Sequence, residues 1–284
     1  MISEIIIQAG IYWFMALGLW INLRVVRYAD LAVENILVIA AMATCGIAAS
    51  GINGVSGVVL ALVLIVPSAL LVAGCVWAAW KVLRVHAIIV SLALGYILYS
   101  VALQVFGAMK DGNGLPKLHA NAQGMLIVYG AVLVVIVMLH LIRHSSAGRH
   151  LLAAVGNPPL AHALGMKPAV WQWLGLSFGT FLMMLSGIFH ACYYTYVNIG
   201  DAVGFLLLGI FSAVLVANGL CPRVVGLWNG LATLLAVAVF QCVITIAIYA
   251  GLPINLNKGL MGLLLIGSVA LLRYRRVSQP ITLS

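Results

Sequence analysis

The stretch VVLALVLIVPSALLVAG at residues 58–74 decides the class of this fold. It carries no charge, and its length approaches the roughly 20 apolar residues that a helix needs to cross a bilayer. Its apolar residues do not alternate with polar ones, as they would on a strand of a membrane barrel. We therefore expect a membrane-spanning helix over residues 57–80, because a helix satisfies its own backbone hydrogen bonds in lipid.

The composition of the whole chain extends this expectation to almost its full length. Of the 284 residues, 65% are hydrophobic and 7% are charged, whereas soluble domains are about 45–50% apolar and about 25% charged. The sequence predicts an all-α polytopic integral membrane protein with about 8–10 transmembrane helices, in a single transmembrane domain over residues 1–284. The expected spans are 5–23, 36–50, 57–80, 86–108, 124–142, 170–194, 203–220, 224–250 and 256–272. The second is short for a crossing, so we expect it to be tilted, re-entrant or interrupted.

The basic residues divide between alternate gaps of these spans. Three of the 14 Lys and Arg residues, Lys110, Lys117 and Lys258, fall on one side. Because Lys and Arg are enriched in cytoplasmic loops, the larger group predicts an N-terminus outside and a C-terminus inside. The net charge of +9 is dispersed over short gaps, so we expect no nucleic-acid partner. The larger group consists of Arg24, Arg27, Lys81, Arg84, Arg143, Arg149, Lys167, Arg223, Arg273, Arg275 and Arg276.

Two segments with a similar pattern start apolar runs five spans apart. Residues 27–41 read RYADLAVENILVIAA and residues 197–211 read VNIGDAVGFLLLGIF. In the expected topology they begin on opposite sides, which suggests an inverted repeat of the kind found in transporters. On this interpretation a translocation path has an inner approach lined by Asp30, Glu34 and Asn35, and an outer one lined by Asn198 and Asp201. Alternatively, each Asp is simply the N-cap of the helix that follows.

The largest cytoplasmic loop, RHSSAGRHLLAAVGNPPLAHALGMKP at residues 143–168, contains two short helix-compatible pieces. Asn157 is placed to cap the second piece and Pro158 suits its first turn, while Gly165 can end it and Pro168 would block its continuation. A capped helix in this position could transmit movement from a soluble partner to the spans on either side. The alternative is an ordinary interfacial loop.

Residues 148–215, which begin GRHLLAAVGNPPLAHALG, resemble the permease subunits of bacterial ABC importers of the branched-chain amino acid and ribose type. The family's pattern of Ala, Gly, Asn and a closing Gly falls on Ala153 or Ala154, Gly156, Asn157 and Gly165, and its small-residue segment on Ser186–Gly187. The stretch LGLWINLRVVRYADLAVENILVIAAMATCGIAASG at residues 17–51 is similar to the N-terminal signature. Within the family, the sequence is most similar to the substrate-unknown branch labelled tryptophan/tyrosine.

The resemblance implies a transport subunit, not an enzyme, which forms the path for a small, amino-acid-like organic solute in the bacterial inner membrane. It implies a cytoplasmic ATPase, an extracytoplasmic solute-binding protein and a second permease subunit, identical or not, as partners within membrane lipid. ATP would be bound by the partner, and we expect no cofactor and no metal in this chain. The ATPase would dock on loop 144–167, through Gly148, Ala153, Gly156, Asn157, Leu160, Leu164 and Gly165.

Two other classes of function compete with this one. An ion-coupled secondary transporter or channel could use Asp30, Glu34 and Asp201 to bind its coupling cation. A membrane enzyme is the weakest alternative, because the sequence shows no nucleophile with an acid–base set. The phosphate-loop pattern GxxxxGK[ST] does not occur either, so energy from ATP would have to come through another chain.

Overall fold

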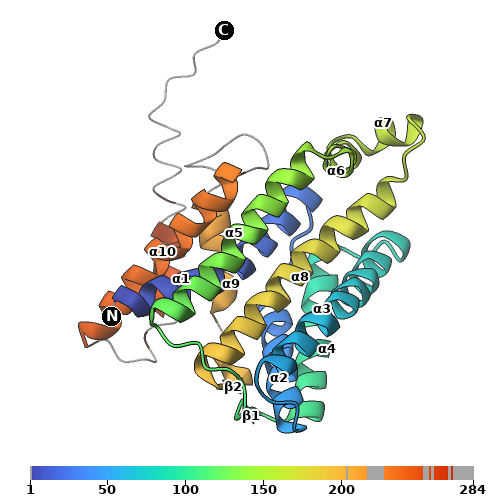
Figure 1. Cartoon of the computed structure of the whole chain (residues 1–284). Helices are drawn as coiled ribbons and strands as arrows, with labels where there is room; N and C mark the ends of the chain where they lie inside the picture. Colours follow the sequence, from blue (N-terminus) through green and yellow to red (C-terminus); the bar gives the residue numbers. More distant parts are fainter. Residues whose placement is uncertain are drawn as a thin grey trace.

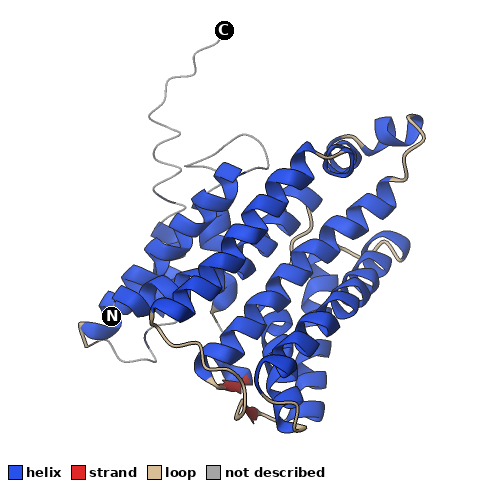
Figure 2. Cartoon of the chain, in the orientation of Figure 1, coloured by secondary structure: helices blue, strands red, loops and turns tan. Residues whose placement is uncertain are grey.

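A computed structural model of the chain describes residues 2–202, 204–215, 227–251, 256, 259–267 and 270. Within them the chain is a bundle of helices with two short strands (Figures 1 and 2), which confirms the all-α membrane class. The longer helices are α1 (Ile2–Trp20, extended by a π-helical turn Ile21–Val26), α3 (Gly54–Trp77, extended by Ala78–Val82), α4 (Ala87–Phe106), α5 (Ala122–His144), α8 (Pro168–Tyr194) and α10 (Leu227–Tyr249). The shorter elements are α2 (Val33–Ala49), α6 (Ser146–Gly156), α7 (Pro158–Ala163), α9 (Phe205–Leu215), β1 (Met109–Asp111), β2 (Tyr196–Asn198) and a 3₁₀ turn (Ile199–Ala202).

Helices α1 and α8 form the centre of the bundle and run antiparallel to each other. About three quarters of each is buried by the other helices, against 28–39% for α3, α4, α5 and α10. Small residues permit this close packing of helices in lipid: Gly18 and Gly179 bring the two backbones together, so that a Cβ on Gly18 would collide with the Gly179 carbonyl. The Ser186 hydroxyl also donates to the Ile11 carbonyl at 2.8 Å.

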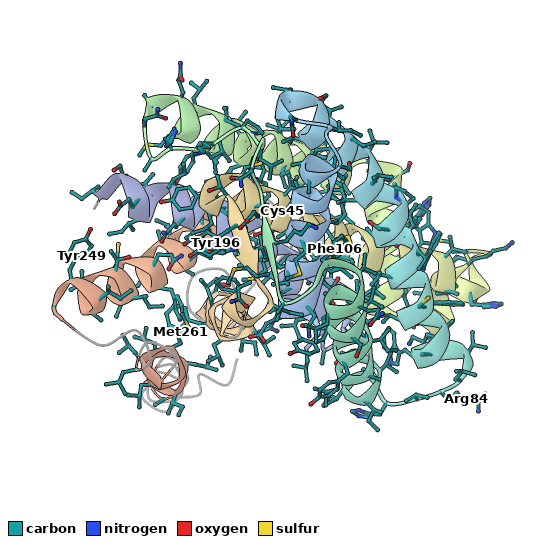
Figure 3. All side chains as sticks on the ribbon, turned by 90° about the horizontal axis from the view of Figure 1, so that it is seen from below. Cys45, Arg84, Phe106, Tyr196, Tyr249 and Met261 are labelled. Carbon is teal, nitrogen blue, oxygen red and sulfur yellow. The ribbon has the colours of Figure 1, made fainter. Side chains whose placement is uncertain are left out.

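The two ends of the bundle carry different structures. At one end lie the N-terminus and an antiparallel pair of strands, in which Lys110 of β1 is opposite Val197 of β2. At the other end lie α6 and α7, which connect α5 to α8 (Figure 1). Seen from the strand end, Phe106 at the end of α4 lies close to α2, where it packs against Gly46 (Figure 3). Loops 107–121 and 144–167 therefore lie on opposite sides of the bundle.

Six of the described helices are long and apolar enough to cross a membrane. They match the first, third, fourth, fifth, sixth and eighth expected spans, with ends that differ by a few residues. The second expected span is the 17-residue helix α2, and the seventh begins with α9. The ninth is helical over 259–267, and the rest of it lies outside the described residues.

Helix α2 begins inside the bundle rather than at its end. Gly187 of α8 packs against Leu37 and Ala41 of α2, while Gly112 contacts both Cys45 of α2 and the residue that follows α8. The two helices are thus parallel, and the start of α2 lies beside roughly residue 183, near the middle of α8. Non-helical residues 27–32 lead the chain from the end of α1 back into the bundle to reach this point.

Helix α9 is entered in the same way from the opposite end. After α8 the chain turns back through β2 and the 3₁₀ turn before α9 begins. Phe205 packs against Tyr12 with ring centroids 4.7 Å apart, and Gly209 packs against Leu19, so α9 runs parallel to α1. Helices α2 and α9 therefore run in opposite directions from starts inside the bundle, which agrees with the inverted relation that the sequence suggests.

Candidate translocation site

Asp30 lies buried in the segment that leads into α2, with only 3% of its surface exposed. Its Oδ2 accepts a hydrogen bond from Asn22 Nδ2 at 3.0 Å, and its Oδ1 accepts one from the Ala32 amide at 3.1 Å. Ala32, and not Asp30, occupies the N-cap position of α2. The carboxylate therefore connects the end of α1 to the start of α2. Asp30 is thus not the N-cap of α2, which was the alternative to a place in the translocation path.

Glu34 reaches from the first turn of α2 to the first turn of α9. Its Oε1 accepts from the Gly204 amide at 2.8 Å and from the Leu206 amide at 3.1 Å. The starts of the two short helices are thus joined by one carboxylate. Asn35, the next residue, extends its amide toward Gly95 of α4, so the three inner-approach residues of the sequence prediction do cluster at the start of α2.

The outer-approach residues Asn198 and Asp201 follow α8, in the segment that leads into α9. Asn198 is in β2 opposite Met109, beyond the end of α8, and its Oδ1 accepts from the Gly200 amide at 2.9 Å. Asp201 lies in the 3₁₀ turn that leads into α9, and its side chain falls outside the described part of the structure. Asp201 is three residues before Gly204, whose amide donates to Glu34, whereas Asn198 lies farther from the start of α2, in β2.

A buried histidine lies next to the start of α9. His190 of α8 is 3% exposed, and its Nδ1 shares a hydrogen bond with the Tyr12 hydroxyl at 3.2 Å. Its ring also lies 4.6 Å from that of Tyr194 and 5.8 Å from that of Phe205, measured between centroids. These aromatic rings fix α1, α8 and α9 to one another at the level where α9 begins.

Helix α4 displays polar side chains on its outer surface, which the sequence analysis missed. Tyr96 and Tyr99 are 74% and 41% exposed, and Ser100 and Gln104 are exposed on the same side of the helix. We call Tyr96, Tyr99, Ser100 and Gln104 the α4 polar stripe. Residues 96, 100 and 104 are four apart and so share a helix face; this spacing inside an apolar span is the signal that could have revealed them.

The other outer helices differ from α4 in this respect. Within the described residues, the outward side chains in the middle of α3, α5 and α10 are apolar, as Leu71, Leu133 and Leu235 illustrate. Such surfaces suit contact with acyl chains. Tyr96 and Ser100 lie near the middle of α4, where an exposed hydroxyl would be costly because hydrocarbon offers it no partner; Gln104 lies in the last turn, toward the membrane boundary. The α4 polar stripe therefore indicates a face that adjoins water or another protein chain.

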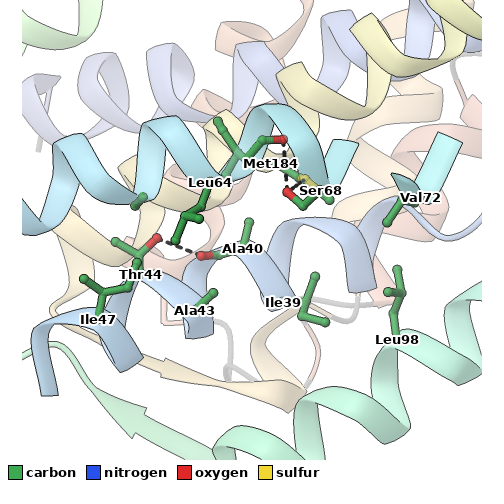
Figure 4. A pocket seen from close by; sticks show the side chains of 12 residues that line it. Ile39, Ala40, Ala43, Thr44, Ile47, Leu64, Ser68, Val72, Leu98 and Met184 are labelled. Atoms are coloured by element: carbon green, nitrogen blue, oxygen red, sulfur yellow. Dashed lines mark hydrogen bonds between the residues drawn. The ribbon is translucent and has the colours of Figure 1, made fainter. Parts of the chain in front are cut away.

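A cavity of about 200 Å³ lies between α2, α3, α4 and α8 (Figure 4). Its two hydroxyl groups are already engaged: Thr44 donates to the Ala40 carbonyl at 2.7 Å, and Ser68 donates to the Ile65 carbonyl at 3.0 Å. The remaining walls are apolar, so the cavity suits hydrocarbon and offers nothing to a charged solute. Its lining residues are Ile39, Ala40, Ala43, Thr44, Ile47, Ala61, Leu64, Ile65, Ser68, Val72, Leu98 and Met184.

The predicted docking loop consists of α6 and α7, which lie across the end of the bundle (Figure 1). Asn157 caps α7, since its Oδ1 accepts from the Leu160 amide at 3.2 Å, and Gly165 ends it with a left-handed φ of 76°. Leu160 and Leu164 are 55% and 68% exposed on one face. Helix α7 ends before Pro168, and Pro168 occupies the first turn of α8, a position that tolerates Pro because its missing N–H has no partner there.

Of the remaining loop residues, some pack against the bundle and others are exposed. Gly148 is buried at the start of α6, where a Cβ would collide with the Ile142 carbonyl. Ala153 and Gly156 are exposed, whereas Ala154 is buried against the bundle. The exposed surface of the loop thus combines the apolar face of Leu160 and Leu164 with exposed basic residues, Arg149 and Lys167, on either side of α7.

Comparisons with known proteins point in one direction. Residues 1–269 match a family model described as "Branched-chain amino acid transport system / permease component". The chain is 26% identical over 218 residues to a "Tyrosine transport system permease protein" of Clostridioides difficile (strain R20291), an alignment that covers 75% of this chain and 72% of the relative. No solved structure matches the chain.

Proposed function

Because the chain belongs to the family of branched-chain amino acid transport system permease components, we propose that it is the membrane subunit of an ABC importer for an amino-acid-like solute. It is a multi-pass membrane protein and a transport component. The relative described as a tyrosine permease supports an aromatic amino acid as the first solute to test. ATP hydrolysis is assigned to a partner chain, and no cofactor is needed in this one.

The observation that carries the proposal is the α4 polar stripe. A path for a polar solute needs hydrogen-bonding groups, and it needs a protein or water boundary rather than lipid. Two permease subunits that pair through α4 would enclose such a path between their stripes and would remove Tyr96 and Ser100 from contact with hydrocarbon. The path would continue inward past Asp30, Glu34 and Asn35 and outward past Asn198 and Asp201.

The exposed α6–α7 segment supports a cytoplasmic ATPase as the second partner. Short exposed helices at one end of the bundle, with Leu160 and Leu164 facing outward, offer the kind of apolar contact that fits a groove of another protein. An extracytoplasmic solute-binding protein would then deliver solute at the opposite end. This assignment places the α6–α7 end in the cytoplasm and the N-terminus outside.

The test is uptake of labelled L-tyrosine and L-leucine into proteoliposomes that contain the chain together with a candidate ATPase and a candidate solute-binding protein from the same organism. Gln104→Leu should lower ATP-dependent uptake about tenfold, the equivalent of one hydrogen bond of about 1.4 kcal/mol. Gln123→Leu is the matched control, because Gln123 is exposed at the start of α5, away from the stripe. Uptake driven by an ion gradient without the ATPase would instead establish a secondary transporter.

A further inference from the structure

Glu34 supplies the N-terminal cap of a helix that begins 170 residues later in the chain. The first N–H groups of an α-helix have no partner within the helix, and a side-chain oxygen usually satisfies one of them from the N-cap residue. At α9, Glu34 Oε1 accepts from Gly204 and Leu206 at 2.8 and 3.1 Å. The cap of α9 therefore comes from α2, across the boundary between the two inverted segments.

The charge of Glu34 suits this position. Helices α2 and α9 run away from the junction in opposite directions, so both present their N-terminal ends to it. Each end carries about half a positive charge from the helix dipole, and two such ends repel each other most strongly away from water. Glu34 belongs to the first turn of α2 and contacts the first turn of α9, so one negative charge faces both ends.

The start of α9 is also fixed on its other sides. Phe205 packs on Tyr12 and His190. Gly204 has a φ of 114°, and a Cβ there would lie 2.8 Å from Met261 Sδ; Met261, labelled in Figure 3, belongs to the helical stretch 259–267. These neighbours fix the start of α9 against α1 and α8, and the Glu34 carboxylate adds the contact that fixes it against α2.

We propose that Glu34 is a positioning residue that fastens the two inverted segments together, so that α2 and α9 move as one unit. The capping contact requires no transport activity, whereas the joint movement during transport rests on the proposed function. This role differs from lining the path, because the carboxylate oxygen is directed to backbone amides of the protein.

Hydrogen–deuterium exchange of the purified full chain in lipid nanodiscs tests the capping contact. Glu34→Ala should speed exchange at the start of α9 about tenfold or more, because a hydrogen bond to a charged group is lost. Glu34→Gln keeps an acceptor but loses the charge, so its exchange should fall between Glu34→Ala and the unsubstituted chain. Glu4→Ala is the matched control, because Glu4 is a first-turn carboxylate at the exposed start of α1 and should leave residues 204–215 unchanged.

Three outcomes would overturn the inference. Exchange at 204–215 could remain unchanged in both Glu34 variants. Alternatively, Glu34→Gln could raise exchange equally in 204–215 and in the distant helix 122–144, or Glu4→Ala could have the same effect as Glu34→Ala. In the proteoliposome assay we expect Glu34→Gln to transport less tyrosine per ATP hydrolysed. If the unsubstituted chain transports neither amino acid, the proposed function fails, while the exchange result still decides the capping role.

Discussion

At the scale of single residues, the buried pair of Asn22 and Asp30 illustrates how this chain places polar groups inside a membrane bundle. Asn22 is fully buried, and its Oδ1 has no hydrogen-bond partner within the described structure. Its Nδ2 depends on Asp30, as does the Ala32 amide. An unpaired polar group in such a site is expensive, so Asp30 stabilises its surroundings even if it never contacts solute.

We therefore predict different effects for two substitutions of Asp30. Asp30→Asn keeps the oxygen that accepts from Ala32, and its new amide can donate to the Asn22 oxygen after the Asn22 side-chain amide turns by about 180°, so the melting temperature in detergent should remain near that of the unsubstituted chain. Asp30→Ala leaves two buried donors unpaired and should destabilise the fold by about 1–3 kcal/mol. Equal destabilisation by both would show that the charge itself is required. Lost uptake in a stable Asp30→Asn variant would place the charge in the path.

At the scale of the element, the short helix α7 should act as the ATPase contact. Leu160→Glu or Leu164→Glu introduces a charge on its exposed apolar face, so co-purification of the ATPase should fall at least tenfold while the permease still reaches the membrane. His162→Glu is the control, since His162 is exposed on the same helix but points away from the two leucines. Undiminished ATPase binding in both leucine variants would contradict docking on this face.

The beginning and end of α7 could be predicted from the sequence, whereas contacts between distant segments could not. Asn157, Pro158 and Gly165 each act on backbone groups only a few residues away, so their roles in α7 could be predicted from sequence neighbours alone. The position of Asp30 could not, because its partner Asn22 belongs to the end of another helix. The contact between Glu34 and α9 was also inaccessible, because it depends on how two distant segments fold back into the bundle.

At the scale of the whole molecule, the sequence predicted the class of fold, but not which spans are complete. Hydropathy detects a run such as 36–50 without showing where in the bilayer the helix starts. In the structure, residues 27–32 complete that crossing without helix. Successive loops therefore still lie at alternate ends of the bundle even though α2 begins inside it, so the basic residues remain grouped at one end.

The orientation of the whole bundle follows from that argument and can be tested directly. Among the described residues, Lys110 and Lys117 lie at the strand end, whereas the α6–α7 end carries Arg24, Arg27, Lys81, Arg84, Arg143, Arg149 and Lys167. Because basic loops are retained in the cytoplasm, the strand end should face outward.

The measurement is labelling of single cysteines in a background where Cys45, Cys75, Cys192, Cys221 and Cys242 have been replaced. An impermeant maleimide applied to intact cells should label Lys117→Cys, which is exposed after β1, and should spare His162→Cys on α7. Permeabilised cells should show both labelled, which controls for the reactivity of each site. The reverse pattern in intact cells would place α7 outside, where no cytoplasmic ATPase could reach it, and would contradict the orientation and the coupling assignment together.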